Sequence, residues 1–360
     1  MSKVYVLYTG GTIGCEGAPL APMPGPQFAQ LILSMPGFAD HHLNGFPSID
    51  YVIDWYDAPL DSANITPAHW VRIAQSVLEV YDRYDGFVVL HGTDTLAWTA
   101  SALSFFLQGL SKPVLLTGSQ LPLGVPRSDA LRNLASAVTI AGTQQINEVC
   151  VFFDDVLLRG NRTMKIDADE FAAFGSPNFS ALARLGADIS IDKSLLLPAP
   201  NPQTSLANPL VRTEAGMQLR KILAGLSIRS VNMLFVFPGV SAGFLKAVLS
   251  QHGTKLAGLV LAAFGKGNAP NADDFLTVLK NAHRNGIVLV DITQVHRGSV
   301  HLDAYQTGAS LRQAGAISGY DLTPAAAFAK LVFLTALDLP LWETETLMQT
   351  SLAGEMTVHI

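Results

Sequence analysis

Short apolar runs that lead into helical stretches recur along this chain, and this alternation constrains the fold more than any other feature of the sequence. The runs that we interpret as strands are 4–8, 87–90, 114–117, 149–153, 233–237, 259–264 and 287–292. The stretches with helical periodicity are 96–110, 127–141, 242–251, 272–285, 324–337 and 343–352. Continuously apolar strands that alternate with helices predict parallel sheets covered on both faces.

A proline-rich stretch divides this pattern in two. Residues 195–210, LLLPAPNPQTSLANPL, contain four prolines and almost no charge, which is typical of a linker. At 360 residues the chain is also long for a single core. We therefore predict a larger N-terminal α/β domain over 1–194, a linker over 195–212 and a smaller C-terminal α/β domain over 213–360.

The composition argues against several classes of partner and location. The net charge of −6 leaves no basic surface for nucleic acid. The sequence has no apolar run long enough to cross a bilayer and no signal-peptide pattern, so we expect no membrane segment. Two cysteines, Cys15 and Cys150, cannot make a disulfide framework, which favours a cytoplasmic protein with reduced thiols. The nine histidines show no zinc-site spacing, so we expect no metal.

The predicted topology indicates where the functional site lies. In open parallel sheets, ligands bind beyond the carboxyl ends of the strands. The segments at those ends are 9–14, 91–95, 118–120, 265–268 and 293–296, and they are rich in hydroxyl, glycine and amide residues, with one acid, Asp94.

The first of these segments, in VLYTGGTIG, could be a nucleotide-binding loop, a turn that exposes Thr12 for chemistry, or a tight turn that binds nothing. A dinucleotide loop requires a glycine where Thr9 stands, and a phosphate loop requires a lysine that is missing. A nucleotide site is therefore disfavoured. The glycines either form a plain tight turn or leave the hydroxyl of Thr12 exposed for chemistry.

The second segment, HGTDT, presents Thr93 and Asp94 at another strand end. Asp94 could simply cap the following helix. If the two threonines face one crevice, however, a third group must remove a hydroxyl proton, and Lys165 in GNRTMKID is the candidate. A lysine in such a place could equally be solvated surface. His91 reads as a packed strand-end residue rather than a base.

Together these loops resemble the L-asparaginase family, in its cytoplasmic, bacterial-type type I branch. The motifs that carry the resemblance are TGGTIG at 9–14, DS at 61–62, LHGTDT at 90–95, TGSQ at 117–120, RGNRTMK at 159–165 and GNAP at 267–270. The similarity runs from about residue 4 to residue 354 in matching order. It implies a two-domain fold whose larger N-terminal sheet is mainly parallel and flavodoxin-like.

The resemblance also implies an activity and its residues. The family hydrolyses asparagine to aspartate and ammonia without a cofactor, and its members are homodimers or homotetramers. By resemblance Thr12 is the nucleophile that forms an acyl-enzyme, and Thr93, Asp94 and Lys165 transfer protons, with the carboxamide held in a dry crevice. The residues implied in substrate binding are Gly11, Asp61, Ser62, Gly92, Ser119 and, from another subunit, Asn268.

Two departures from the family pattern have consequences. Many relatives carry a tyrosine in the loop after TGGTIG, where this chain has Leu20. Some type I enzymes bind a second, regulatory asparagine, but the family's arginine and cysteine there are Ala262 and His296 in this chain, although Thr163 is retained. We therefore expect little or no activation by asparagine through that site.

Four alternatives stay open at this point. The chain could be a glutaminase-asparaginase, or the amidase subunit of a tRNA-dependent amidotransferase, although its acidic composition argues against an RNA partner. It could also be a non-catalytic amino-acid sensor on the same fold, or a nucleotide-binding oxidoreductase. Release of ammonia separates the enzymes from the sensor.

Overall fold

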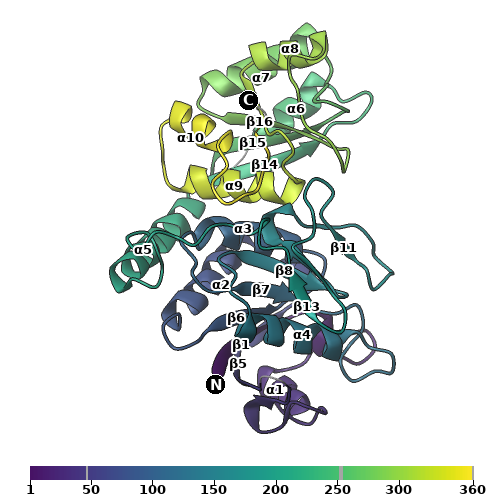
Figure 1. The fold of residues 1–360 in the computed structure, drawn as a ribbon. Coiled ribbons are helices and arrows are strands. Elements are labelled where there is room, and N and C mark those ends of the chain that lie inside the picture. Colours follow the sequence, from purple (N-terminus) through teal and green to yellow (C-terminus); the bar gives the residue numbers. More distant parts are fainter. Residues whose placement is uncertain (46–47, 251–253, 359–360) are drawn as a thin grey trace. The chain divides into compact units, whose positions relative to one another are not determined.

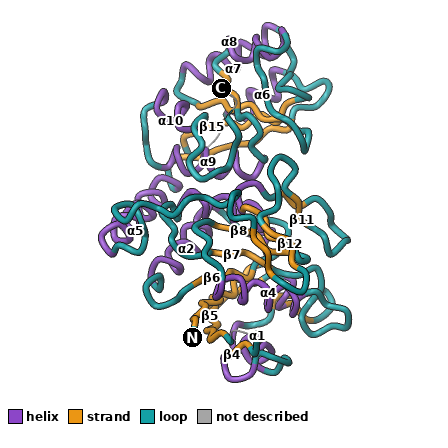
Figure 2. The backbone as a smooth tube through the Cα atoms, viewed as in Figure 1, coloured by secondary structure: helices purple, strands orange, loops and turns teal. Residues whose placement is uncertain are grey.

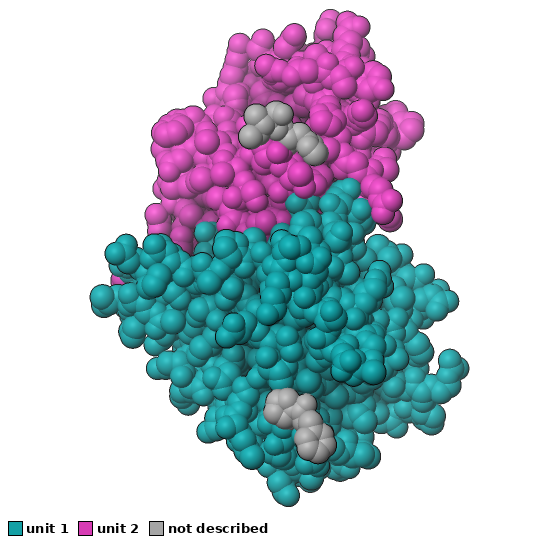
Figure 3. Space-filling view, in the orientation of Figure 1, with its two compact units in different colours: residues 1–216 teal, residues 217–360 magenta. Residues whose placement is uncertain are grey.

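The computed structural model describes residues 1–45, 48–250 and 254–358, and its chain divides into two compact units. Unit 1 is Met1–Gly216 and unit 2 is Met217–Ile360 (Figure 3). Among the described residues, no helix is both long and apolar enough to span a membrane.

Unit 1 is built on a mixed sheet whose centre is parallel. The strand order is β13-β12-β9-β8-β7-β6-β1-β5-β4. The strands are β1 (Ser2–Gly10), β4 (His42–Leu43), β5 (Ile49–Leu60), β6 (Gly86–Leu90), β7 (Val114–Thr117), β8 (Val149–Phe153), β9 (Val156–Arg159), β12 (Ala183–Leu185) and β13 (Ile189–Ile191). The run β5-β1-β6-β7-β8 is parallel, and the pairs outside it are antiparallel. The carboxyl ends of β1, β6 and β7 therefore point the same way. Figure 2 shows β6, β7 and β8 side by side in this sheet.

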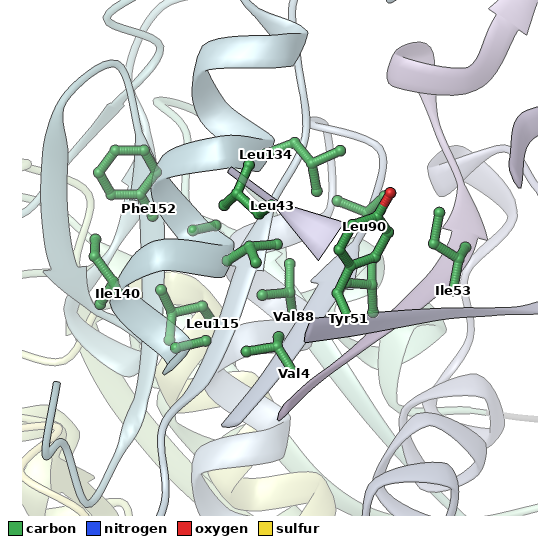
Figure 4. Packing of buried hydrophobic residues seen from close by; sticks show 14 of the residues in the cluster. Val4, Leu43, Tyr51, Ile53, Val88, Leu90, Leu115, Leu134, Ile140 and Phe152 are labelled. Atoms are coloured by element: carbon green, nitrogen blue, oxygen red, sulfur yellow. The ribbon is translucent and has the colours of Figure 1, made fainter. Parts of the chain in front are cut away.

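Helices cover this sheet and complete its core. They are α1 (Gly25–Leu33), α2 (Pro67–Glu79), α3 (Leu96–Phe106) and α4 (Ala130–Thr143), with α5 (Pro209–Leu226) ending beyond the unit (Figure 1). Val4, Val88 and Leu115 from three adjacent strands pack with Leu134 and Ile140 of α4 (Figure 4). Full burial of each such side chain stabilises the fold by about 1.5–3 kcal/mol, which explains why the central strands read as continuous apolar runs.

Unit 2 has a smaller parallel sheet of its own. Its strands, in spatial order, are β14 (Arg229–Phe235), β15 (Lys255–Ala263), β16 (Val288–Thr293) and β17 (Ala316–Ser318). Its helices are α6 (Ala242–Leu249), α7 (Asp273–Arg284), α8 (Gln306–Gln313), α9 (Pro324–Ala336) and α10 (Leu341–Met348). The predicted fold class, two α/β domains with a mainly parallel sheet in the larger one, is confirmed.

Element ends differ from the predictions for local reasons. The helix predicted over 127–141 begins at Ala130, because Arg127 has a positive φ of 65°. The helix predicted over 96–110 ends at Phe106, ahead of Gly109 with its φ of 82°. Helix α5 begins at Pro209, inside the stretch interpreted as a linker, and the domain limits 1–194 and 213–360 stay a prediction.

Candidate active site

The glycine loops after β1 and β6 touch each other through their backbones. Gly11 has a φ of 89°, and a Cβ added to it would lie 2.4 Å from the backbone nitrogen of Gly92. A Cβ on Gly92 would in turn lie 2.5 Å from Oγ of Ser62. A side chain at either position would force its neighbours to shift, and at Gly11 those neighbours are backbone atoms. The structure therefore brings together three of the residues that the sequence predicts for the site.

Thr12 opens the single turn of 3-10 helix η1 (Thr12–Gly14) that follows this contact. The backbone N–H of Gly14 donates to the carbonyl of Gly11 at 3.1 Å, which closes the turn. Thr12 itself is half-buried. Thr9, at the end of β1, donates its hydroxyl to the carbonyl of Leu90 in β6 at 2.8 Å, so the two loops begin from strand ends that are bonded together.

Lys165 joins Thr93 to Asp94. It lies in the two-residue strand β10 (Met164–Lys165), and its Nζ donates to Oγ1 of Thr93 at 2.9 Å and to Oδ1 of Asp94 at 2.7 Å. Thr93 is buried, whereas the side chain of Asp94 is 67 % exposed and that of Lys165 is 21 % exposed. In this arrangement the ammonium donates to the hydroxyl, so the lysine must lose a proton before it can accept one from Thr93.

Two sequence alternatives for this loop can now be decided. Asp94 is not the N-cap of α3, since Thr95 occupies that position. Lys165 is not solvated surface, since its side chain is only 21 % exposed and is bonded to Thr93.

His91 is a packed residue, as its sequence context suggested. Its Nδ1 lies 2.8 Å from the carbonyl of Gly92 and its Nε2 lies 2.9 Å from Oγ1 of Thr99. Complete burial lowers the pKa of His91 to about 4, so the imidazole is neutral at neutral pH. With both ring nitrogens engaged, it anchors α3 to the strand end and is not available as a base.

Asp61 and Ser62 lie at the carboxyl end of β5, beside this loop. Oδ1 of Asp61 accepts from the backbone N–H of Ala63 at 2.9 Å and caps the short turn η3 (Ser62–Asn64). Ser62 is buried, and its carbonyl accepts from the hydroxyl of Thr95 at 2.8 Å.

Ser119 follows the carboxyl end of β7 and lies in a loop that contacts the loop after β6. It is fully buried, and its hydroxyl donates to the carbonyl of Leu121 at 2.5 Å. A Cβ on the preceding Gly118 would lie 2.4 Å from the carbonyl oxygen of His91, so the loops after β6 and β7 are in contact. Sequence reasoning did not single out the next residue, Gln120, whose side chain reaches the loop after Lys165.

Three further residues named in the sequence analysis have the following surroundings. Asn268 belongs to unit 2, where its Oδ1 accepts from the hydroxyl of Thr307 at 2.7 Å. Leu20 lies in the exposed loop between β2 (Cys15–Glu16) and β3 (Ala21–Pro22), and 55 % of its surface is exposed. Thr163 is fully buried and donates its hydroxyl to the carbonyl of Arg159 at 2.7 Å, so this hydroxyl is already engaged within the fold.

No charge cluster suggests a metal here. Within the described part of the chain, no group of three or more His, Cys, Asp or Glu side chains is arranged to hold an ion.

Strand-end loops that present threonines, a shared lysine and close-packed glycines on a two-unit α/β fold point to one class of proteins, the asparaginase-type amidohydrolases. The chain matches the family model for the asparaginase N-terminal domain over residues 3–196 and the glutaminase/asparaginase C-terminal domain over 230–348. The chain belongs to the asparaginase family, which confirms the resemblance seen in its sequence motifs.

Individual relatives agree with this assignment. The chain is 41 % identical to L-asparaginase 1 of Escherichia coli K12, over 99 % of this chain and 98 % of that protein. It is 37 % identical to a 60 kDa lysophospholipase of Homo sapiens, over 99 % of this chain and 61 % of that protein. The crystal structure of L-asparaginase I from Vibrio cholerae superimposes with a TM-score of 0.82 at 38 % identity, covering 99 % of each chain.

Proposed function

We propose that this protein hydrolyses L-asparagine to L-aspartate and ammonia through a threonine nucleophile. The observation that carries this proposal is the position of the Lys165 ammonium, 2.9 Å from the hydroxyl of Thr93 and 2.7 Å from the carboxylate of Asp94. This cluster adjoins the backbone contact between Gly11 and Gly92, and Gly11 immediately precedes Thr12.

In the first half-reaction Thr12 attacks the side-chain amide. A bond forms between its Oγ1 and the carbonyl carbon, the carbon–nitrogen bond breaks, and the hydroxyl proton is delivered to the departing nitrogen, which leaves as ammonia. An amide is a weak electrophile, so its oxygen must be stabilised as charge develops on it. We assign this role to backbone N–H groups near Gly11, Thr93 and Ser119.

In the second half-reaction water releases the product. This step requires Lys165 as the neutral amine. The water oxygen bonds to the acyl carbon while its proton passes to Oγ1 of Thr93, and the Thr93 hydroxyl proton passes to Lys165. The ester bond to Thr12 then breaks, and Lys165 returns its extra proton through Thr93 to the Thr12 oxygen. Asp94 stabilises the ammonium form of Lys165 on each cycle. The role of Lys165 therefore lies mainly in this step.

The charged ends of the substrate need opposite partners. The exposed carboxylate of Asp94 is free on its solvent side to bind the α-ammonium group. Ser62, with Asp61 and Gly92 shaping the backbone around it, takes the α-carboxylate through hydroxyl and N–H donors. This leaves the side-chain carboxamide directed toward the two threonines.

The assembly and location belong to the same proposal. We assign Asn268 to the site of a neighbouring subunit in a homodimer or homotetramer. The two free cysteines, Cys15 and Cys150, suit a cytoplasmic enzyme with reduced thiols. We assign it no cofactor, nucleic-acid partner or membrane partner.

Ammonia release from L-asparagine and from L-glutamine, each over a concentration series, tests the proposal. We expect turnover of asparagine that exceeds turnover of glutamine at equal concentration. Comparable rates on both amides would make the protein a glutaminase-asparaginase, and asparagine binding without ammonia would make it a sensor.

A further inference from the structure

The hairpin that carries Lys165 is too small to hold the lysine in place by its own pairing. Its strands β10 and β11 (Phe174–Gly175) contain two residues each and are joined only to each other. Two-stranded ribbons of this kind are marginal without further packing. At the base of the hairpin the ring of Phe174 packs on that of Phe153, with centroids 5.0 Å apart. The far end needs a second anchor.

That anchor is the amide side chain of Gln120. The turn after Lys165 is shaped by Asp167, whose Oδ1 accepts from the N–H groups of Asp169 and Glu170, both at 2.8 Å. Nε2 of Gln120 donates to the carbonyls of Ala168 at 3.1 Å and Glu170 at 3.0 Å. One amide thus uses both of its hydrogens to hold the end of the hairpin.

The backbone of Gln120 is itself held in place by hydrogen bonds to Asp129. Its backbone N–H donates to the carboxylate of Asp129, at 3.1 Å and 3.0 Å from the two oxygens, and the N–H of Leu121 donates to the same group at 3.1 Å. Asp129 is buried, and Asn133 of α4 links it to the carbonyl of Gly118 with bonds of 3.1 Å and 3.0 Å. The loop after β7 is therefore a rigid base.

We infer that Gln120 is a positioning residue for Lys165, acting by fastening the Lys165 hairpin to the strand end that carries Ser119. This inference rests on the proposed role of Lys165 in the second half-reaction. The bonds it concerns lie at the surface, where Ala168 and Glu170 are exposed, so their loss affects stability little. A substitution at Gln120 can therefore displace Lys165 without a large change in the stability of the protein.

The experiment compares Gln120→Glu with the parent protein. The substitution keeps the shape of the side chain and replaces its donors with a carboxylate that repels the two carbonyls. We expect a rapid burst of ammonia followed by a steady rate reduced roughly 10- to 100-fold, because slight misplacement of a catalytic group has effects of this size. In a Lys165→Met background the same change has no further effect on the rate.

Hydrogen exchange supplies a readout that does not need activity. The backbone amides over 164–175 exchange faster in Gln120→Glu than in the parent protein. Gln108→Glu is the matched control, because its exposed amide also donates to a backbone carbonyl, that of Phe105 at 3.2 Å, away from this hairpin. It leaves both the rate and the exchange over 164–175 unchanged.

Each outcome separates this inference from the proposed function. A parent protein that releases no ammonia overturns the proposed function. Faster exchange over 164–175 in Gln120→Glu would even then support the role of Gln120 in holding the Lys165 hairpin. Unchanged exchange and rate in Gln120→Glu, or equal further losses with and without Lys165, overturn the inference.

Discussion

At the scale of single residues, the site depends on one ammonium group that is shared by two oxygens. Lys165 lies between the buried hydroxyl of Thr93 and the exposed carboxylate of Asp94. In the proposed mechanism, Thr93 links the lysine to proton transfer, and Asp94 links it to the ammonium group of the substrate.

Replacing this lysine separates its chemical and structural roles. Lys165→Met is expected to lower turnover by about 10²–10⁴-fold, the usual contribution of a general acid–base group. Its unfolding temperature should stay close to that of the parent, because a pair this exposed contributes little to stability. Ammonia release and thermal unfolding measured on one preparation check both statements. A folded variant with the parent rate would show that the lysine is structural.

At the scale of elements, the glycine turns set how closely two loops approach. Gly11→Ala places a methyl group 2.4 Å from the Gly92 nitrogen at a φ of 89°. We expect a loss of more than about 1 kcal/mol in unfolding free energy and a large loss of turnover. Denaturant unfolding and ammonia release measure the two effects.

Gly124→Ala is the matched control for this change. Nothing lies within 4 Å of a Cβ added at Gly124, and its φ is not positive. We expect its unfolding free energy to stay within about 0.5 kcal/mol of the parent. If Gly11→Ala behaved in the same way, the close contact between the loops would not be needed.

The parallel strands β1, β6, β7 and β8 could be predicted from sequence because both of their faces are buried. The limits of β7 and β8 agree with the predicted 114–117 and 149–153, and those of β1 and β6 agree to within two residues. The strand β5 was missed, since it alternates between buried and exposed residues and carries three aspartates among apolar side chains. Helix α5 was missed because it begins within the proline-rich stretch and buries few residues.

The site could be predicted in part, for a related reason. Thr93, Asp94 and Lys165 could be grouped from motifs whose spacing resembles one family, and the structure places these three together. Gln120 belongs to the TGSQ motif, but its contacts could not be predicted because its partners are backbone carbonyls 48 and 50 residues away, which leave no pattern in a single sequence.

At the scale of the whole molecule, Asp291 makes stability depend on pH. It is fully buried in β16, and within the described residues neither of its side-chain oxygens has a hydrogen-bond partner. Burial raises the pKa of Asp291 to about 8, compared with 3.8 for an unperturbed aspartate. The folded state thus retains a proton that the unfolded chain gives up at much lower pH.

The direction of the effect follows from linkage. With a pKa higher in the folded state, the stabilising contribution is fully present below pH 4 and is lost progressively as the pH rises to about 8. We expect the unfolding temperature of the parent protein to fall between pH 5 and pH 8. The unfolding temperature of Asp291→Asn should fall less over the same range. Parallel pH curves for the two proteins would contradict this account.

The regulatory behaviour of the whole enzyme is also predictable. The hydroxyl of Thr163 is buried and already donates to Arg159, and Ala262, in place of the family's arginine, offers no charge. We expect a hyperbolic dependence of rate on asparagine concentration, measured by ammonia release. A sigmoidal dependence that is abolished by changing Thr163 would contradict this.

In the proposed mechanism Thr12 forms the covalent intermediate and Thr93 serves to release it. Its most direct test is mass spectrometry of protein quenched after mixing with L-asparagine, comparing Thr93→Ala with Thr12→Ala. We predict that Thr93→Ala accumulates an aspartyl ester on Thr12 with one equivalent of ammonia, and that Thr12→Ala forms no adduct. An adduct on another residue, or turnover in Thr12→Ala close to that of the parent, would contradict the claim.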